Sequence, residues 1–127
     1  MVDALFNDPN YLAAKKTLDA VVLRQQAIAS NIANAETPGY QRIDLSPSFQ
    51  AELQKACAAG DAQQINALQP NLVPDQTAVA RGRDGNTVSL EQELGQMNQN
   101  TVLNAVETQL VSYNLLRLKM AVTGKSS

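Results

Sequence analysis

Apolar and small side chains recur near both ends of the chain at spacings that mostly alternate between three and four residues. This period places them along one narrow side of an α-helix, which is the pattern of a helix–helix seam. We therefore expect two long helices, over about residues 10–35 and 89–122. The first stripe comprises Tyr11, Ala14, Leu18, Val21, Ile28, Ile32 and Ala35, and the second comprises Leu90, Leu94, Met97, Leu103, Val106, Leu110, Tyr113, Leu116 and Met120.

Residues suited to helix ends flank both stripes. Asp8 is suited to cap the first helix, with Pro9 at its first position. Ser89 and Gln92 have the spacing of a capping box, and Gly124 follows the second helix as a C-terminal cap would. These caps support the two expected helices at three of their four ends.

The second stripe is interrupted by the polar run QMNQNT, which covers residues 96–101. This run is a candidate kink in one helix or a break between two. The chain has 127 residues, enough for one domain, and only 4% of them are aromatic. Two helices cannot cover each other's apolar sides completely, so the stripes also predict partners.

The segment between the helices, residues 36–88, has a mixed pattern. Turn signals occur at Pro38-Gly39 and at residues 84–86, and Ser46-Pro47 can start a short helix that ends at Gly60. In that helix we expect Phe49, Leu53 and Cys57 to lie on one side, with Cys57 as a small, semi-buried apolar residue. A further helical turn is expected over residues 61–68, and a short strand is expected within residues 72–80.

Together these patterns predict a mainly α fold. The long N- and C-terminal helices pair as a coiled-coil-like hairpin, and the middle is irregular, with a short helix and a short strand. We expect one structural unit in three parts. These are residues 1–45 with the first helix and a turn motif, residues 46–88 as a variable middle segment, and residues 89–127 with the second helix.

Charge and composition argue against several functional classes. The net charge of −2 argues against a nucleic-acid interface. The sequence has no run of about 18 or more apolar residues, so we expect no transmembrane helix. The opening stretch MVDALFNDPNY carries acids and no basic residue, so we expect no secretory signal peptide.

The sequence also lacks a recognisable catalytic constellation. It contains no histidine, and Glu91 and Glu93 are placed to favour the dipole at a helix start. The stretch RGRDGN, residues 81–86, gives only a weak phosphate-loop signal and lacks the alternating acids of a calcium loop. We therefore expect no enzyme activity, no metal and no cofactor.

Asn31 and Asn34 lie three residues apart in the last turns of the first helix. Asparagine is a poor helix former, so two in this position require a reason. Fraying and C-capping account for Asn34 better than for Asn31. The alternative is that the two carboxamides bond to a neighbouring segment and fix its register.

The stretch ASNIANAETPGY, residues 29–40, resembles the signature near the N-terminus of bacterial flagellar axial proteins, which form rod, hook and hook-associated structures. The likeness covers both end regions. The stretch RDGNTV from Arg83 and the MNQN stretch from Met97 narrow it to short proximal rod subunits of the FlgB type. The residues that match the signature are Ala29, Asn31, Ile32, Ala33, Asn34, Thr37, Pro38, Gly39 and Tyr40.

The resemblance implies a structural subunit of the flagellar basal-body rod in the periplasm, exported by the flagellar type III apparatus without a cleaved signal peptide. Its terminal helices would pack into an axial tube with copies of itself, other rod subunits and membrane-ring adaptor proteins at the base. That tube would transmit torque to the distal rod and hook. In this family the ends often fold only on assembly.

The expected assembly interface follows the two helical stripes, and the turn motif would direct the chain away from the tube. On the first helix the interface residues are Leu18, Val21, Ile28, Asn31, Ile32 and Asn34. The turn motif is Thr37, Pro38, Gly39 and Tyr40, and on the second helix the interface residues are Leu94, Met97, Leu103, Val106, Leu110, Tyr113, Leu116 and Met120. Two alternatives remain: another short rod subunit of this family, or a soluble helical module that binds one partner or acts like a chaperone.

Overall fold

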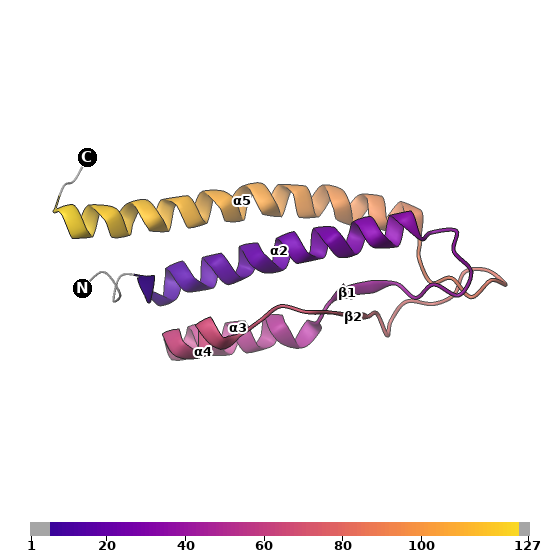
Figure 1. Cartoon of the computed structure of the whole chain (residues 1–127), viewed down its shortest axis with the longest axis horizontal. Coiled ribbons are helices and arrows are strands. Elements are labelled where there is room, and N and C mark those ends of the chain that lie inside the picture. The colour runs from indigo at the N-terminus through magenta and orange to yellow at the C-terminus, as the bar shows by residue number, and fades with distance from the viewer. Residues whose placement is uncertain (1–5, 125–127) are drawn as a thin grey trace.

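The computed structural model describes residues 6–124 of the chain. Two long helices lie side by side and antiparallel, and a pair of shorter helices packs on the other side of the first long helix (Figure 1). The fold is therefore mainly α with a long helical hairpin, as predicted. The expectation about a signal peptide falls partly on residues 1–5, outside the described residues. The elements in chain order are α2 (Pro9–Ala33), β1 (Ile43–Leu45), α3 (Pro47–Ala59), α4 (Ala62–Ala67), β2 (Leu72–Pro74) and α5 (Leu90–Thr123).

Helix α2 begins as its sequence predicts and ends slightly earlier. The Asp8 carboxylate accepts hydrogen bonds from the backbone N–H groups of Asn10 and Tyr11, at 2.9 and 3.1 Å. These bonds satisfy two of the free donors at the helix start. The helix stops at Ala33 rather than Ala35, and Asn34 caps it with a backbone N–H that donates to the Ser30 carbonyl.

Helix α5 is continuous over its 34 residues, so the polar run does not break it into two helices. The Ser89 hydroxyl accepts from the backbone N–H of Gln92, and Gly124 ends the helix in the left-handed conformation with a φ of 67°. The polar run does not interrupt the helix because one of its members, Asn100, faces α2. There the Asn100 amide donates to the carbonyl of Val21.

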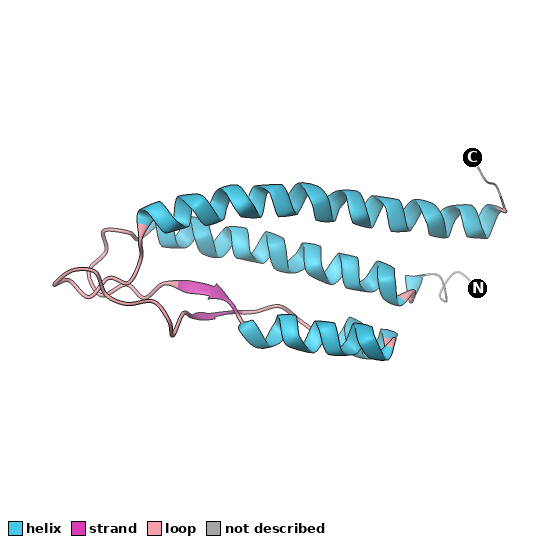
Figure 2. Ribbon diagram, turned by 180° about the vertical axis from the view of Figure 1, so that it is seen from behind, coloured by secondary structure: helices cyan, strands magenta, loops and turns pink. Residues whose placement is uncertain are grey.

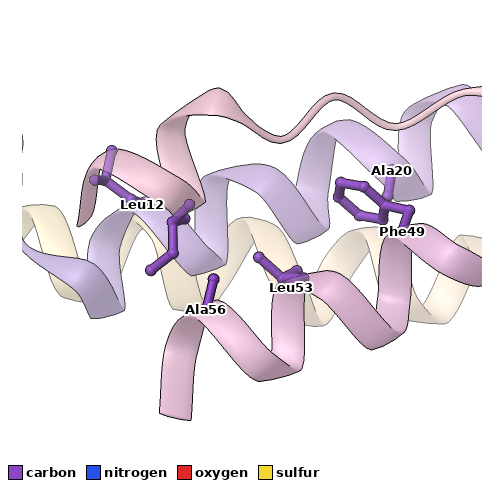
Figure 3. Close-up of a cluster of buried hydrophobic side chains, with 6 residues drawn as sticks. Leu12, Ala20, Phe49, Leu53 and Ala56 are labelled. Atoms are coloured by element: carbon purple, nitrogen blue, oxygen red, sulfur yellow. The ribbon is translucent and has the colours of Figure 1, made fainter. Parts of the chain in front are cut away.

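The hydrophobic core lies between α2 and the α3–α4 pair, away from α5 (Figure 3). On α3 the predicted stripe is correct for Phe49 and Leu53 and wrong for Cys57, which is exposed. Ala56 takes the buried position, because a residue seven places after Phe49 lies nearer the centre of this stripe than one eight places after it. The core comprises Leu12, Ala20, Phe49, Leu53, Ala56 and Ile65.

The segment between the two long helices contains one more strand than predicted. The short strand β2 lies within the expected range, and it pairs antiparallel with β1, with Asp44 opposite Val73. Strand β1 is only three residues long and has a carboxylate at its centre, so periodicity gave no sign of it. Both strands lie between the α3–α4 pair and the loops at the closed end of the hairpin (Figure 2). Within residues 6–124, no helix combines the length and apolar character needed to cross a membrane.

Candidate functional site

Asn31 joins the end of α2 to strand β1. Its side chain is 0% exposed, and its carboxamide pairs with the backbone of Ile43 as a neighbouring strand would. The Ile43 N–H donates to Asn31 Oδ1 at 3.0 Å, and Asn31 Nδ2 donates to the Ile43 carbonyl at 2.8 Å. The interpretation that both carboxamides bond a neighbouring segment therefore holds for Asn31 and is wrong for Asn34, whose Nδ2 donates to the Ser30 carbonyl of its own helix at 2.8 Å. The bonds of Asn31 to Ile43 fix the position of β1 relative to α2.

The turn after α2 brings Tyr40 back onto the helix. The Tyr40 hydroxyl donates to Asn31 Oδ1 at 3.1 Å and lies 3.0 Å from the hydroxyl oxygen of Ser30. Gly39 has a φ of 73°, a conformation that a side chain would strain. Its N–H donates to the carbonyl of Asp84 at 2.7 Å. The turn motif is therefore held to the loop that precedes α5 as well as to α2.

Asn86 in that loop makes a second connection. Its Nδ2 donates to the carbonyls of Asn34 and Thr37, each at 2.8 Å. Its Oδ1 accepts from the backbone N–H of Val88 at 2.8 Å. One buried side chain thus satisfies carbonyls at the end of α2 and positions the chain that enters α5. The sequence placed Asn86 in a turn and in the stretch RDGNTV, but it did not predict these bonds.

A buried ionic cluster, here called the Arg42 cluster, closes the same end of the hairpin. Arg42 donates to Asp44 at 2.9 Å and to Asp75 at 2.8 Å. It therefore connects strand β1 to the residue that follows strand β2. It also pairs with Glu93 on α5, whose side chain is 0% exposed. The guanidinium of Arg42 also donates to Gln96. A buried ion pair that also has hydrogen-bonded partners constrains geometry as well as charge.

The electrostatics of the cluster favour its charged form. Burial acts to lower the pKa of Arg42, but hydrogen bonds to Glu93 and Asp44 outweigh it and raise that pKa above its ordinary value. The Thr77 hydroxyl, and to a smaller extent Arg42, hold the pKa of Asp75 below its usual range despite partial burial. Both shifts indicate that the ion pairs persist at neutral pH.

The turn motif, Asn31, Asn86 and the Arg42 cluster together form one unit, here called the joint. The sequence predicted the turn motif, and bonding of Asn31 to a neighbouring segment was one of the two interpretations it left open. It missed Arg42 and treated Glu93 as an acid that only favours the helix dipole. The available signal was spacing, because Glu93, Asn100 and Glu107 follow one another at intervals of seven, as residues on one side of a helical seam do.

The apolar stripe of α5 points away from the rest of the chain. Seven of its members are at least 41% exposed, and Tyr113 reaches 59%. The five from Leu103 to Leu116 lie on one side of the helix and are here called the outer stripe. Val106, Leu110 and Tyr113 also line a shallow groove formed by α5 residues. Met97 and Met120 are half-buried. Leu90 and Leu94 are also exposed, but Leu94 lies nine residues before Leu103, which is two and a half turns and so the opposite side of α5. The outer stripe consists of Leu103, Val106, Leu110, Tyr113 and Leu116.

The predicted interface residues of α2 lie differently. Val21 and Ile28 are buried inside the chain, and Leu18, Ile32 and Asn34 are half-buried. The structure therefore does not bring the two predicted stripes together as one intramolecular seam. Leu103 alone among the outer stripe shares a small gap with Val21.

An open cleft of about 680 Å³ lies beside the Arg42 cluster, between residues 75–81 and the first turns of α5. It is lined by Arg42, Asp75, residues 77–81, Thr87 and the α5 residues Gln92, Gly95, Gln96 and Gln99. Among residues 6–124, no group of three or more His, Cys, Asp or Glu side chains is arranged to hold a metal ion. The feature of this end with the most hydrogen bonds and ion pairs is thus the joint.

Comparison with known proteins gives the family. A family model described as flagella basal body rod protein matches residues 13–41, which run from the first turns of α2 through the turn motif. The flagellar basal body rod protein FlgB of Escherichia coli (strain K12) is 33% identical over 108 residues, covering 69% of this chain and 74% of that protein. The chain belongs to the FlgB family of flagellar basal body rod proteins.

More distant FlgB proteins match over a greater length. That of Borrelia hermsii is 25% identical over 127 aligned residues, covering 86% of this chain and 92% of that protein. That of Borreliella burgdorferi is 27% identical over 114 residues, covering 76% and 82%. This FlgB-family protein is a structural rod subunit of the flagellar basal body, and its relatives are structural rod proteins.

Proposed function

We propose that this FlgB-family protein assembles into the proximal rod by packing its outer stripe against helices of neighbouring subunits. The observation that supports this is the exposure of five large apolar side chains along one side of a single helix. Monomeric proteins rarely expose a contiguous apolar patch of this kind, and such patches mark interaction sites. Burying a leucine fully stabilises a contact by about 1.5–3 kcal/mol, so several together are enough to drive assembly.

On α2, the predicted interface residues contribute in a less direct way. Val21 and Ile28 hold α2 within the chain, and Leu18 and Ile32 add partly exposed area at its sides. Asn31 and Asn34 act through the joint, which sets the angle at which α5 leaves the loops. The α2 residues thus shape the interface, and the outer stripe supplies most of its apolar area.

The joint suits a part that carries mechanical load. Its hydrogen bonds and ion pairs connect α2, both strands and the start of α5 through buried groups. A network with paired members resists rearrangement because opening it leaves charged groups unpaired. We propose that torque from the membrane ring passes through this end of each subunit towards the distal rod and hook.

The remaining parts of the proposal come from membership of the family. The partners are copies of this chain, other rod subunits and ring adaptor proteins, reached by type III export without a cleaved signal peptide. The assembled location is the periplasmic part of the basal body. The protein acts through assembly, without catalysis and without a cofactor.

Thiol protection tests the interface. In a Cys57→Ser background, Val106→Cys places one thiol on the outer stripe, and Thr101→Cys places one on another exposed side of α5. We expect a maleimide to label both thiols in the isolated chain, and to label Val106→Cys much more slowly in purified basal bodies. Equal labelling of Val106→Cys in the two states would contradict the proposal.

A further inference from the structure

A small gap with both polar and apolar walls lies between α2 and α5, near the start of α3. Its volume is about 210 Å³, and it is lined by Leu103, Glu107 and Asn100 of α5 together with Arg24 of α2. Since one water occupies about 30 Å³ of liquid, the gap has room for a long side chain. Leu103 also belongs to the outer stripe, so the gap lies beside the surface proposed to receive a neighbouring helix.

Asn100 leaves a buried acceptor at this gap. The side chain is 1% exposed, and its Nδ2 donates to the Val21 carbonyl and to Gln25 Oε1, both at 2.9 Å. A carbonyl can only accept, so the bond to Val21 identifies which atom of the amide is the nitrogen. Asn100 Oδ1 is buried and receives no hydrogen bond from residues 6–124. Buried acceptors are normally satisfied, so this one points to a donor.

Glu107 adds an uncompensated charge on the same side of the gap. It is half-buried, and burial raises the pKa of its carboxyl. Within the described range it makes no ion pair. The one cation that lines the gap, Arg24, already bonds to Asp44 at 3.1 Å and to Gln96 at 3.3 Å. The gap therefore offers two acceptors, one of them charged, and its own cation is engaged elsewhere.

We propose that this gap receives the cationic side chain of a neighbouring rod subunit, with its N–H groups donating to Asn100 Oδ1 and Glu107. The side chain would enter beside Leu103 from a helix packed on the outer stripe, so the inference rests on the proposed assembly. Charge complementarity selects a lysine or arginine over an apolar residue at that position. Such a contact fixes the register of the neighbouring helix, which the apolar stripe alone leaves free to slide.

A lysine mimic tests the site on the isolated chain. The probe is n-butylammonium, which has the four-carbon stem and terminal amine of lysine, and n-butanol is its neutral counterpart. NMR titration follows the side-chain amide of Asn100 and the carboxyl carbon of Glu107. We expect both signals to shift saturably with n-butylammonium and to shift little with n-butanol.

Matched variants separate the site from general charge attraction. Glu107→Gln keeps the shape of the side chain and should weaken binding about fivefold, the difference between hydrogen bonds to a charged and to a neutral acceptor. Glu91→Gln removes an exposed acid from the same helix and should leave binding unchanged. The absence of a saturable shift, an equal response to n-butanol, or equal weakening by Glu91→Gln would overturn the proposal. Because no assembly is needed, these results are independent of thiol protection in basal bodies.

Discussion

Helices α2 and α5 lie side by side and carry similar apolar stripes, yet α2 buries its stripe and α5 exposes most of its own. Helix α2 buries Val21 and Ile28 within the chain, whereas α5 exposes Val106 and Leu110. The difference shows that seam spacing alone does not tell whether a stripe is buried within its own chain.

The side of α5 that faces α2 explains how this arrangement is specified. Glu93, Asn100, Glu107 and Asn114 recur at every seventh position, and all four are buried or half-buried. Polar residues in a seam fix register and orientation at a cost in stability. Glu93 accepts a hydrogen bond from Asn31, and Asn100 donates one to the Val21 carbonyl. These bonds hold α5 with its apolar side outward.

The largest expected effect tests the exposed side of this comparison. Leu110→Asp should abolish rod assembly, because it places a charge in the centre of the outer stripe. The isolated chain should remain as stable as the unmodified one to within about 0.5 kcal/mol, as is usual for exposed positions. Motility and recovery of the chain in basal bodies measure the first result, and urea unfolding measures the second.

Thr101→Asp is the matched control for this charge. Thr101 is exposed and lies nine residues before Leu110, which is two and a half helical turns and therefore on the opposite side of α5. It should retain assembly. Normal motility with Leu110→Asp, or equal loss with both variants, would remove the distinction between the two sides of the helix.

The buried side of the comparison is tested at Glu93. Glu93→Ala should lower the free energy of unfolding by about 3 kcal/mol, because Arg42 loses a buried partner. Asp44 and Asp75 remain, so the loss should lie at the lower end of the usual range for a broken buried pair. Glu91→Ala, on an exposed position in the same helical turn, should cost less than about 0.5 kcal/mol. Similar losses for both variants in urea unfolding would show that burial of Glu93 has no special role.

A smaller effect is expected at the turn. Gly39→Val should lower stability by about 1–2 kcal/mol and weaken assembly, because a residue with a Cβ is strained at a φ of 73°. A Cβ at this position meets no atom within 4 Å, so the cost comes from the backbone alone. Gly39→Asn should cost less, because asparagine adopts this conformation more readily. Equal thermal stability of the two variants would contradict this explanation.

The smallest effect concerns pH. The pKa of Asp75 is depressed in the folded chain, so its contribution is present above its unfolded value of about 3.9 and is lost as pH falls through the folded value. Asp75→Asn should therefore be less stable than the unmodified chain at pH 7, with the difference shrinking below about pH 4. Urea unfolding at several pH values measures this. A difference that is independent of pH would show that the Asp75 charge contributes nothing.

The sequence predicted the elements with strong local signals. Caps at Asp8, Ser89 and Gly124 and turns at Gly39 and Gly85 act within a few residues, so the pattern alone identifies them. Strand β1 was missed because its partner lies nearly thirty residues further along the chain, at residues 72–74. Cys57 was misplaced because helical spacing alone did not distinguish it from Ala56.

The candidate site was predicted less completely for the same reason. The signature identified Asn31 and the turn. The partners of Arg42 come from β1, from the residue that follows β2 and from α5, which only the tertiary fold brings together. Charged residues are also almost never fully buried, which made Glu93 look like a solvated acid. Its spacing from Asn100 and Glu107 becomes informative once the facing helix is known.

The position of the joint at one end of the hairpin distributes stiffness unevenly along the molecule. Near the turn, α2 and α5 are connected through a dense set of buried bonds, while their opposite ends, around Pro9 and Thr123, lie at the other end of the hairpin (Figure 1). We therefore expect bending to concentrate at the end away from the turn, where contacts with adjacent subunits decide the angle between the helices. One sequence can then occupy geometrically unequal positions along a shaft, with its closed end unchanged and its open end adapted to each location.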